Sequence, residues 1–147
     1  ACGEATGGMH GADRIGGLSS ANGIVFGRIA GASAALAAQK EPEAALKADI
    51  TLPQYGITTT DAEHLTRSLK HTMSTYCMIN RTETGLSEAL HELEGLKTEA
   101  TTLSTQKAQD SEVAALARLQ SQIQLAQEMV KAMRKRTESL GSHYRAD

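Results

Sequence analysis

The most regular apolar pattern lies near the end of the chain, where apolar side chains recur at alternating steps of three and four residues. This spacing places them on one face of an amphipathic helix that packs against partner helices. It predicts a helix over Asp110–Ser139, which Gly141 ends as a C′ glycine. The apolar positions are Leu116, Leu119, Ile123, Ala126, Val130 and Met133.

Two further helices with the same kind of pattern are predicted upstream. Thr60 followed by Glu63 is a capping-box pattern, and a second helix start lies at Thr82–Thr84. The polar stretch Thr98–Gln109 predicts a loop. Residues 56–147 are therefore expected to be a bundle of three antiparallel helices with short connections. The apolar positions are Leu65, Leu69, Thr72 or Met73, Tyr76 and Ile79 in the first helix, and Leu86, Ala89, Leu93 and Leu96 in the second.

The first 40 residues have a different composition, since nine of the 13 glycines fall within residues 1–31. Residues 1–18 show no periodicity, and glycines supply backbone conformations that other residues resist. Ser19 or Ser20 is expected to cap a helix over Ser19–Ala38, on which Ile24, Val25, Ile29 and Ala30 form an apolar face. The fold class expected is mainly α, with a glycine-rich segment and one helix followed by the three-helix bundle.

A linker is expected at residues 41–55, between the two kinds of sequence. Pro42 disfavours helix at the residue before it, and Pro53 breaks the chain again. A short helical turn is expected between them at Glu43–Lys47. The chain is thus expected to consist of three segments, at residues 1–40, 41–55 and 56–147.

Composition excludes several classes of protein. Aromatic residues make up only 3% of the chain, which argues against a β-sandwich or barrel. The net charge of −2 predicts no nucleic-acid partner. The charge-free stretch Ile29–Gln39, about 11 residues long, is too short to span a membrane.

Cys2 and Cys77 are too few for a disulfide framework, and the five histidines show no metal-binding spacing, so no metal site is expected. Met73, Met78, Met129 and Met133 are expected in the core.

The glycine-rich opening is the candidate for chemistry. A glycine loop that ends at serines heading a helix brings free backbone N–H groups and the positive end of the helix dipole together, which suits anions. Arg14 lies in the same loop, where its guanidinium could make a two-pronged contact with a carboxylate. The alternative is an ordinary turn with a surface arginine.

Three stretches of the chain resemble one family. Residues 3–17, GEATGGMHGADRIGG, followed by VFGRIAG at residues 25–31, resemble the last FAD-binding stretch of the succinate dehydrogenase/fumarate reductase flavoproteins, roughly G-E-x-x-G-G-x-H-G-A-N-R-L-G-G-N-S-L and V-F-G-R-x-A-G. The end of the chain, RTESLGSHYRAD at residues 136–147, is similar to the family's R-x-E-S-R-G-x-H-Y-R-x-D. Residues 78–86, MINRTETGL, resemble the turn between the first helices of its helical domain. L-Aspartate oxidase and adenylylsulfate reductase are relatives within this group.

The resemblance implies roles for four residues. Glu4 corresponds to the family's FAD-contacting glutamate and Ser19 to its flavin-contacting serine. Ser20 stands where the family has leucine, which contacts the flavin through its backbone N–H. Arg14 corresponds to the arginine that binds a carboxylate of succinate or fumarate. The helix dipole would favour the negative charge of a reduced flavin.

The chain departs from the family at three positions. Asp13 replaces an asparagine and could compete for Arg14, Leu18 replaces an asparagine that helps hold the loop, and Leu140 replaces the arginine of E-S-R-G. These departures leave open which dicarboxylate is the substrate.

The opening also suggests a piece of a longer protein. The resemblance implies that the family's dinucleotide-binding motif, its proton-donating arginine and its other substrate histidine lie upstream of such a piece. The histidine to which some members attach FAD would lie there too. We therefore expect an FAD-dependent enzyme as the parent and no catalytic residue within these 147 residues. This chain alone is expected neither to hold FAD nor to be active.

The expected partners follow from the same resemblance. They are a dicarboxylate and an electron-donor protein, in the cytoplasm or on the cytoplasmic face of a membrane through partner subunits. The alternative is a non-enzymatic helical interaction module. The helix over Ser19–Ala38 is apolar or small on all sides except at Arg28, so it needs cover from the bundle or from a second copy in a homodimer.

Overall fold

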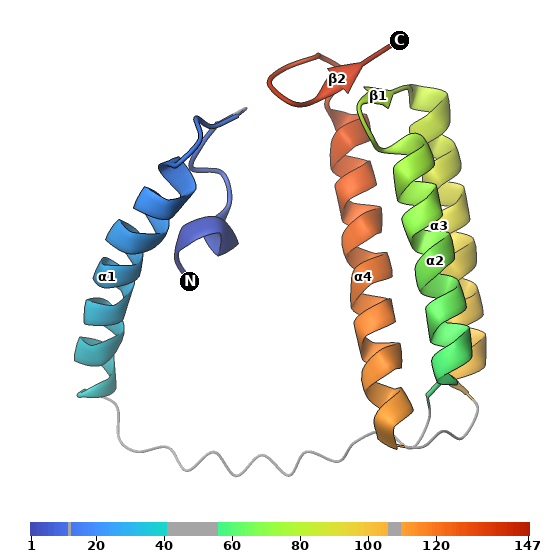
Figure 1. Ribbon diagram of the computed structural model, residues 1–147, viewed down its shortest axis with the longest axis horizontal. Coiled ribbons are helices and arrows are strands. Elements are labelled where there is room, and N and C mark those ends of the chain that lie inside the picture. Colours follow the sequence, from blue (N-terminus) through green and yellow to red (C-terminus); the bar gives the residue numbers. More distant parts are fainter. Residues whose placement is uncertain (12, 41–55, 106–109) are drawn as a thin grey trace. The chain divides into compact units, whose positions relative to one another are not determined.

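The computed structural model describes residues 1–11, 13–40, 56–105 and 110–147, which form two compact units (Figure 1). The first unit, Ala1–Asp49, contains the short 3₁₀ helix η1 (Gly3–Thr6) and helix α1 (Leu18–Ala38). The second unit, Ile50–Asp147, contains three helices and a two-stranded sheet. The expected helical turn at Glu43–Lys47 and the break at Pro53 lie outside the described residues.

The second unit is the predicted bundle. Its helices are α2 (Thr59–Tyr76), α3 (Glu83–Ser104) and α4 (Asp110–Lys135), and each contacts the other two (Figure 1). The core is aliphatic and contains most of the predicted positions, so the mainly α fold is confirmed. The side chains with almost no exposure are Ile57, Leu65, Leu86, Leu93, Leu119, Ile123 and Val130.

Threonine caps begin α2 and α3. Thr58 Oγ1 accepts a hydrogen bond from the backbone N–H of Asp61 at 3.1 Å, so α2 begins before the predicted Thr60. Thr82 Oγ1 accepts from the N–H of Gly85 at 3.1 Å, which confirms the second helix start. Each cap satisfies an N–H that the helix itself leaves without a partner.

Helix α3 continues through the stretch that was predicted to be a loop, as far as Ser104. The hydroxyl groups of Thr98, Thr101 and Thr102 donate to the carbonyl groups four residues earlier, at 2.8–3.0 Å. Ala100 is buried in the core and anchors this last part of the helix. The prediction from polar composition was wrong because these threonines bond back to their own helix and the packing of Ala100 outweighs their low helix propensity.

Helix α4 ends at Lys135, before the predicted Ser139. Beyond it the chain turns back, and β2 (Tyr144–Arg145) pairs in parallel with β1 (Asn80–Arg81). Gly141 has φ 60°, but it lies in the turn closed by the backbone pairing of Leu140 with His143 and does not cap the helix.

Three predicted core residues lie at the surface. Ile79 is 73% exposed because α2 ends at Tyr76 and no longer turns it inward. Met78, beyond the same helix end, and Met129, on the outer face of α4, are also exposed. Met73 and Met133 pack against the core as expected.

Helix α1 has 21 residues, most of them apolar or small. By length and composition it could cross a membrane, a criterion that a core helix of a folded protein also meets. The prediction that Ile29–Gln39 is too short to span a membrane considered only the residues without charge. The helix is longer than that stretch, because it extends past Arg28 toward the N-terminus.

The bundle register can be tested by two neighbouring substitutions in α4. Ile123→Ala should lower the free energy of unfolding by about 2–5 kcal/mol, because it leaves a cavity in the core. Gln124→Ala, at an exposed position one residue away, should change it by less than about 0.5 kcal/mol. Denaturation in urea measures both, and equal losses would contradict the register.

Candidate functional site

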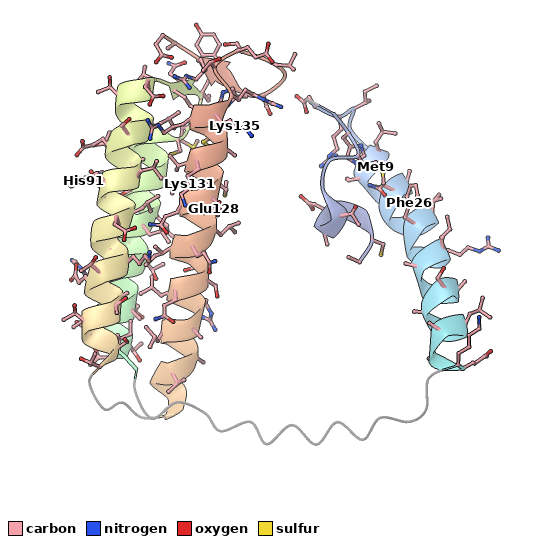
Figure 2. All side chains as sticks on the ribbon, turned by 180° about the vertical axis from the view of Figure 1, so that it is seen from behind. Met9, Phe26, His91, Glu128, Lys131 and Lys135 are labelled. Carbon is pink, nitrogen blue, oxygen red and sulfur yellow. The ribbon has the colours of Figure 1, made fainter. Side chains whose placement is uncertain are left out.

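The glycine-rich loop of the first unit folds onto α1. Gly3 is buried with φ 66°, and a Cβ built on it would lie 3.5 Å from the Cα of Gly23 in α1. Cys2 lies beside Gly27, one turn further along the helix. Met9 and Phe26 line a hollow between the loop and the helix (Figure 2). The loop therefore reaches the helix backbone at positions without side chains.

The backbone of this loop depends on glycine at several positions. Gly7, Gly8 and Gly11 have φ between 63° and 68°, a region that other residues rarely adopt. Gly17, at the N-cap of α1, has φ 86° and offers no side-chain cap, so neither Ser19 nor Ser20 occupies the expected capping position. Both serines belong to the first turn of the helix.

The loop and the start of α1 enclose a pocket of about 220 Å³. Three of the four residues predicted for the site line it, namely Glu4, Arg14 and Ser19. Ser20 does not, and its backbone N–H donates to the carbonyl of Gly17 at 3.1 Å. A flavin contact through that N–H would have to share this hydrogen bond.

Asp13 and Arg14 do not form the competing ion pair that their adjacency suggested. The Asp13 Oδ1 accepts from the backbone N–H of Arg14 at 2.7 Å. Within the described part of the chain, no carboxylate lies within ion-pair distance of the Arg14 guanidinium. Arg14 is exposed and lines the pocket, so its donors are accessible to a ligand.

Two residues of this pocket, His10 and Asn22, were not predicted from the sequence. Asn22 is 93% buried, and its Nδ2 lies 3.3 Å from the Nε2 of His10. The spacing from Ser19 to Asn22 is three residues, which places both on one face of α1. That spacing was the available signal, but it is weak, because pairs of polar residues three apart are common on helices that bind no ligand.

A second polar cluster holds the C-terminal residues to the bundle. The Arg145 side chain is only 5% exposed, and its guanidinium binds both carboxylate oxygens of Asp147 at 2.9 and 3.0 Å. Asp147 also accepts from the backbone N–H of Glu83, the first residue of α3. Glu83 in turn pairs with Arg134 of α4, so the cluster joins the chain end to two helices.

His143 joins the same C-terminal segment to β1. Its Nδ1 lies 3.3 Å from the Arg81 guanidinium, and its Nε2 lies 2.9 Å from the carbonyl oxygen of Arg136. Because a guanidinium only donates and a carbonyl only accepts, the ring carries its proton on Nε2. His143 therefore links β1 to the segment that follows α4.

Most of the second unit matches a known protein family. Residues 66–147 match the family model described as the fumarate reductase flavoprotein C-terminal domain, over more than half of the chain. The chain belongs to the succinate dehydrogenase/fumarate reductase-type flavoproteins. No solved structure matches it.

One relative of this flavoprotein chain extends the likeness to the glycine-rich loop. It is an uncharacterised FAD-dependent oxidoreductase of Methanocaldococcus jannaschii, 31% identical over 163 aligned positions. The alignment covers all of this chain and 28% of the relative, so the flavoprotein chain spans less than a third of that protein's length.

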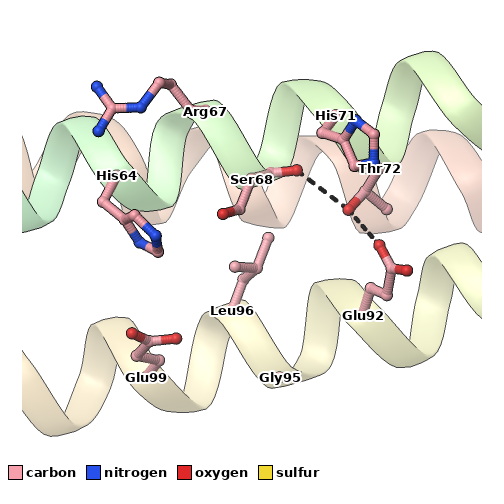
Figure 3. Close-up of a pocket in the computed structure, with 9 residues that line it drawn as sticks. All are labelled: His64, Arg67, Ser68, His71, Thr72, Glu92, Gly95, Leu96 and Glu99. Carbon is pink, nitrogen blue, oxygen red and sulfur yellow. Dashed lines mark hydrogen bonds between the residues drawn. The ribbon is translucent and has the colours of Figure 1, made fainter.

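An open groove of about 620 Å³ lies between α2 and α3, beside Gly95, which has no side chain to fill it (Figure 3). On its wall, the Thr72 hydroxyl donates to Glu92, and the Tyr76 hydroxyl donates to the same carboxylate at 3.2 Å. Burial, together with the nearby Glu92 charge, raises the pKa of Tyr76. In the part of the chain that the structure describes, no three His, Cys, Asp or Glu side chains are placed to hold a metal ion.

The basic residues at the end of α4 are partly neutralised. Lys131 Nζ lies 2.6 Å from Glu128 (Figure 2). Arg134 pairs with Glu83. The positive ends of these side chains also complement the C-terminal end of the helix dipole.

The cluster around Arg145 predicts a loss of stability in acid. Hydrogen bonds from Arg145 and from the backbone lower the pKa of Asp147, and Arg134 lowers that of Glu83. Since both pKa values are lower in the folded state, their stabilisation is complete above the ordinary carboxyl pKa of about 4 and is lost as the pH falls through the folded values.

Urea denaturation at neutral and at acid pH measures this effect. Asp147→Asn should reduce the dependence of the unfolding free energy on pH below about pH 4. Glu99→Gln, which changes an exposed carboxylate on α3, should leave that dependence as it is in the unaltered chain. An unaltered dependence in Asp147→Asn would show that the Asp147 carboxylate contributes nothing to it.

Proposed function

We propose that this chain is the carboxyl-terminal portion of an FAD-dependent oxidoreductase that interconverts fumarate and succinate or a related dicarboxylate. The observation that carries the proposal is the pocket in which Glu4, Arg14 and Ser19 meet at the start of α1. Family membership and a relative named as an FAD-dependent oxidoreductase support the cofactor. The dicarboxylate rests on Arg14 and on the resemblance of the loop.

The pocket residues fit a flavin nucleotide. A Cβ at Gly7, Gly8 or Gly17 would meet open space, so these glycines leave the loop backbone accessible to a flat or phosphorylated ligand. The first turn of α1 directs backbone N–H groups and a positive dipole end toward the same place. In addition, a buried amide oxygen of Asn22 lacks a hydrogen-bond partner within the described residues. Glu4, Ser19 and the start of α1 would hold the cofactor.

Bound FAD would supply the hydride chemistry, and this chain would supply binding and electrostatics. Arg14 can hold a substrate carboxylate with two parallel hydrogen bonds, which fixes the orientation of the dicarboxylate. The positive end of α1 would stabilise negative charge on the reduced ring system. The proton donor and the remaining substrate contacts would come from the rest of the flavoprotein, as would the site for an electron-donor protein.

The exposure of α1 supports a covering partner. Ile24 is 74% exposed, and Val25, Ile29 and Leu36 are exposed as well. An apolar surface of this kind is usually covered by another part of the protein or by a second molecule. In the intact flavoprotein the rest of the flavin domain would cover it.

The chain on its own is expected to cover this surface by forming a homodimer. Sedimentation of the isolated chain should therefore give the mass of two copies. A monomer in which the α1 amides are protected from hydrogen exchange would contradict the dimer and indicate packing within one chain.

Reconstitution tests the proposed cofactor and reaction. The chain is joined or refolded with the upstream part of its flavoprotein, and the visible absorbance of bound flavin and the reduction of fumarate are measured. Retained flavin and dicarboxylate turnover are the expected results. A folded protein that retains no flavin would instead favour a non-enzymatic helical interaction module.

Arg14→Lys tests the carboxylate contact. In the intact flavoprotein it should lower kcat/KM for the dicarboxylate by about tenfold or more, because lysine keeps the charge but loses the planar pair of donors. The melting temperature should be unchanged, since Arg14 is exposed. Arg67→Lys, at an exposed position on α2, is the matched control. An unchanged kcat/KM in Arg14→Lys would remove Arg14 from the substrate site.

A further inference from the structure

Asn22 is a buried polar residue at the base of the loop pocket. It lies in the first turns of α1, three residues after Ser19, and only 7% of its surface is exposed. Both residues line the pocket, together with Glu4, His10 and Arg14. Buried side-chain amides in folded proteins are almost always hydrogen-bonded at both ends.

Only one end of the Asn22 amide is satisfied by the described residues. Nδ2 donates to Nε2 of His10 across 3.3 Å and so ties the loop to the helix. Oδ1 is fully buried and has no hydrogen-bond partner in the described part of the chain. An unpaired buried acceptor costs free energy, and an apolar side chain of similar size would avoid that cost.

We propose that Asn22 is a positioning residue of the pocket, which holds His10 through Nδ2 and receives a hydrogen bond at Oδ1 from an N–H or O–H group of the bound flavin nucleotide. This inference rests on the proposed function, because it presumes that a flavin fills the pocket. It goes beyond that function by assigning a role to a residue that neither the sequence pattern nor the family likeness singles out.

The chemistry of Oδ1 distinguishes the two ligands that the pocket could receive. An amide oxygen only accepts hydrogen bonds, and so does a dicarboxylate at neutral pH, so a substrate carboxylate cannot satisfy it. A flavin nucleotide carries an imide N–H and several hydroxyl groups, each of which can donate. Arg14 and the N–H groups of α1 offer the opposite polarity and suit the anionic groups.

Substitutions of Asn22 in the intact flavoprotein test the proposal. Asn22→Leu keeps the size of the side chain and removes both hydrogen bonds. It should raise the dissociation constant for FAD about tenfold and shift the visible flavin spectrum. Asn80→Leu, which replaces an exposed asparagine of β1, should change neither quantity.

Asn22→Asp tests the proposed role of Asn22 if the leucine variant does not fold. It retains an acceptor oxygen, so FAD should stay bound, while the added negative charge should lower the reduction potential of the flavin. A potential equal to that of the unaltered protein would overturn the proposal. An Asn22→Leu variant that binds FAD normally and melts at a higher temperature would also overturn the proposal. The Asn22 amide would then only destabilise the fold and would have no part in binding. Absence of flavin from the unaltered intact protein would overturn the proposed function itself.

Discussion

The contact between Gly3 and Gly23 is the constraint on which the candidate site depends. It brings the start of the chain against the backbone of α1, and the loop between them then has to return to the N-terminus of the same helix. Glycines with positive φ at positions 7, 8 and 11 make that return possible. The pocket with Glu4, Arg14 and Ser19 is the result, so residues up to 15 apart in sequence meet at one helix end.

In the second unit the buried Arg145 has the corresponding role. Its guanidinium needs several acceptors once it leaves water, and Asp147, Glu83 and the carbonyl groups at the end of α4 supply them. The chain end, the start of α3 and the end of α4 are thereby fixed together. The last residues, which resemble the family motif, thus complete the bundle in this chain.

Features that follow from periodicity could be predicted from the sequence, whereas features that depend on single tertiary contacts could not. The α4 apolar face and the Thr82 helix start were correct, because each follows from local spacing or a local cap. The loop predicted at Thr98–Gln109 was wrong up to Ser104, because the packing of Ala100 is a tertiary effect. At the candidate site, the resemblance singled out Arg14 and Ser19, which line one pocket. No local pattern indicates the contact between His10 and Asn22, because it joins the loop to the helix.

The central claim is that the glycine loop and the start of α1 form part of a flavin site. A crystal structure of the intact flavoprotein with its cofactor tests it most directly. We expect the flavin at the N-terminal end of α1, within hydrogen-bond distance of Ser19 and Glu4. A cofactor bound elsewhere, with this loop in contact only with protein, would contradict the account.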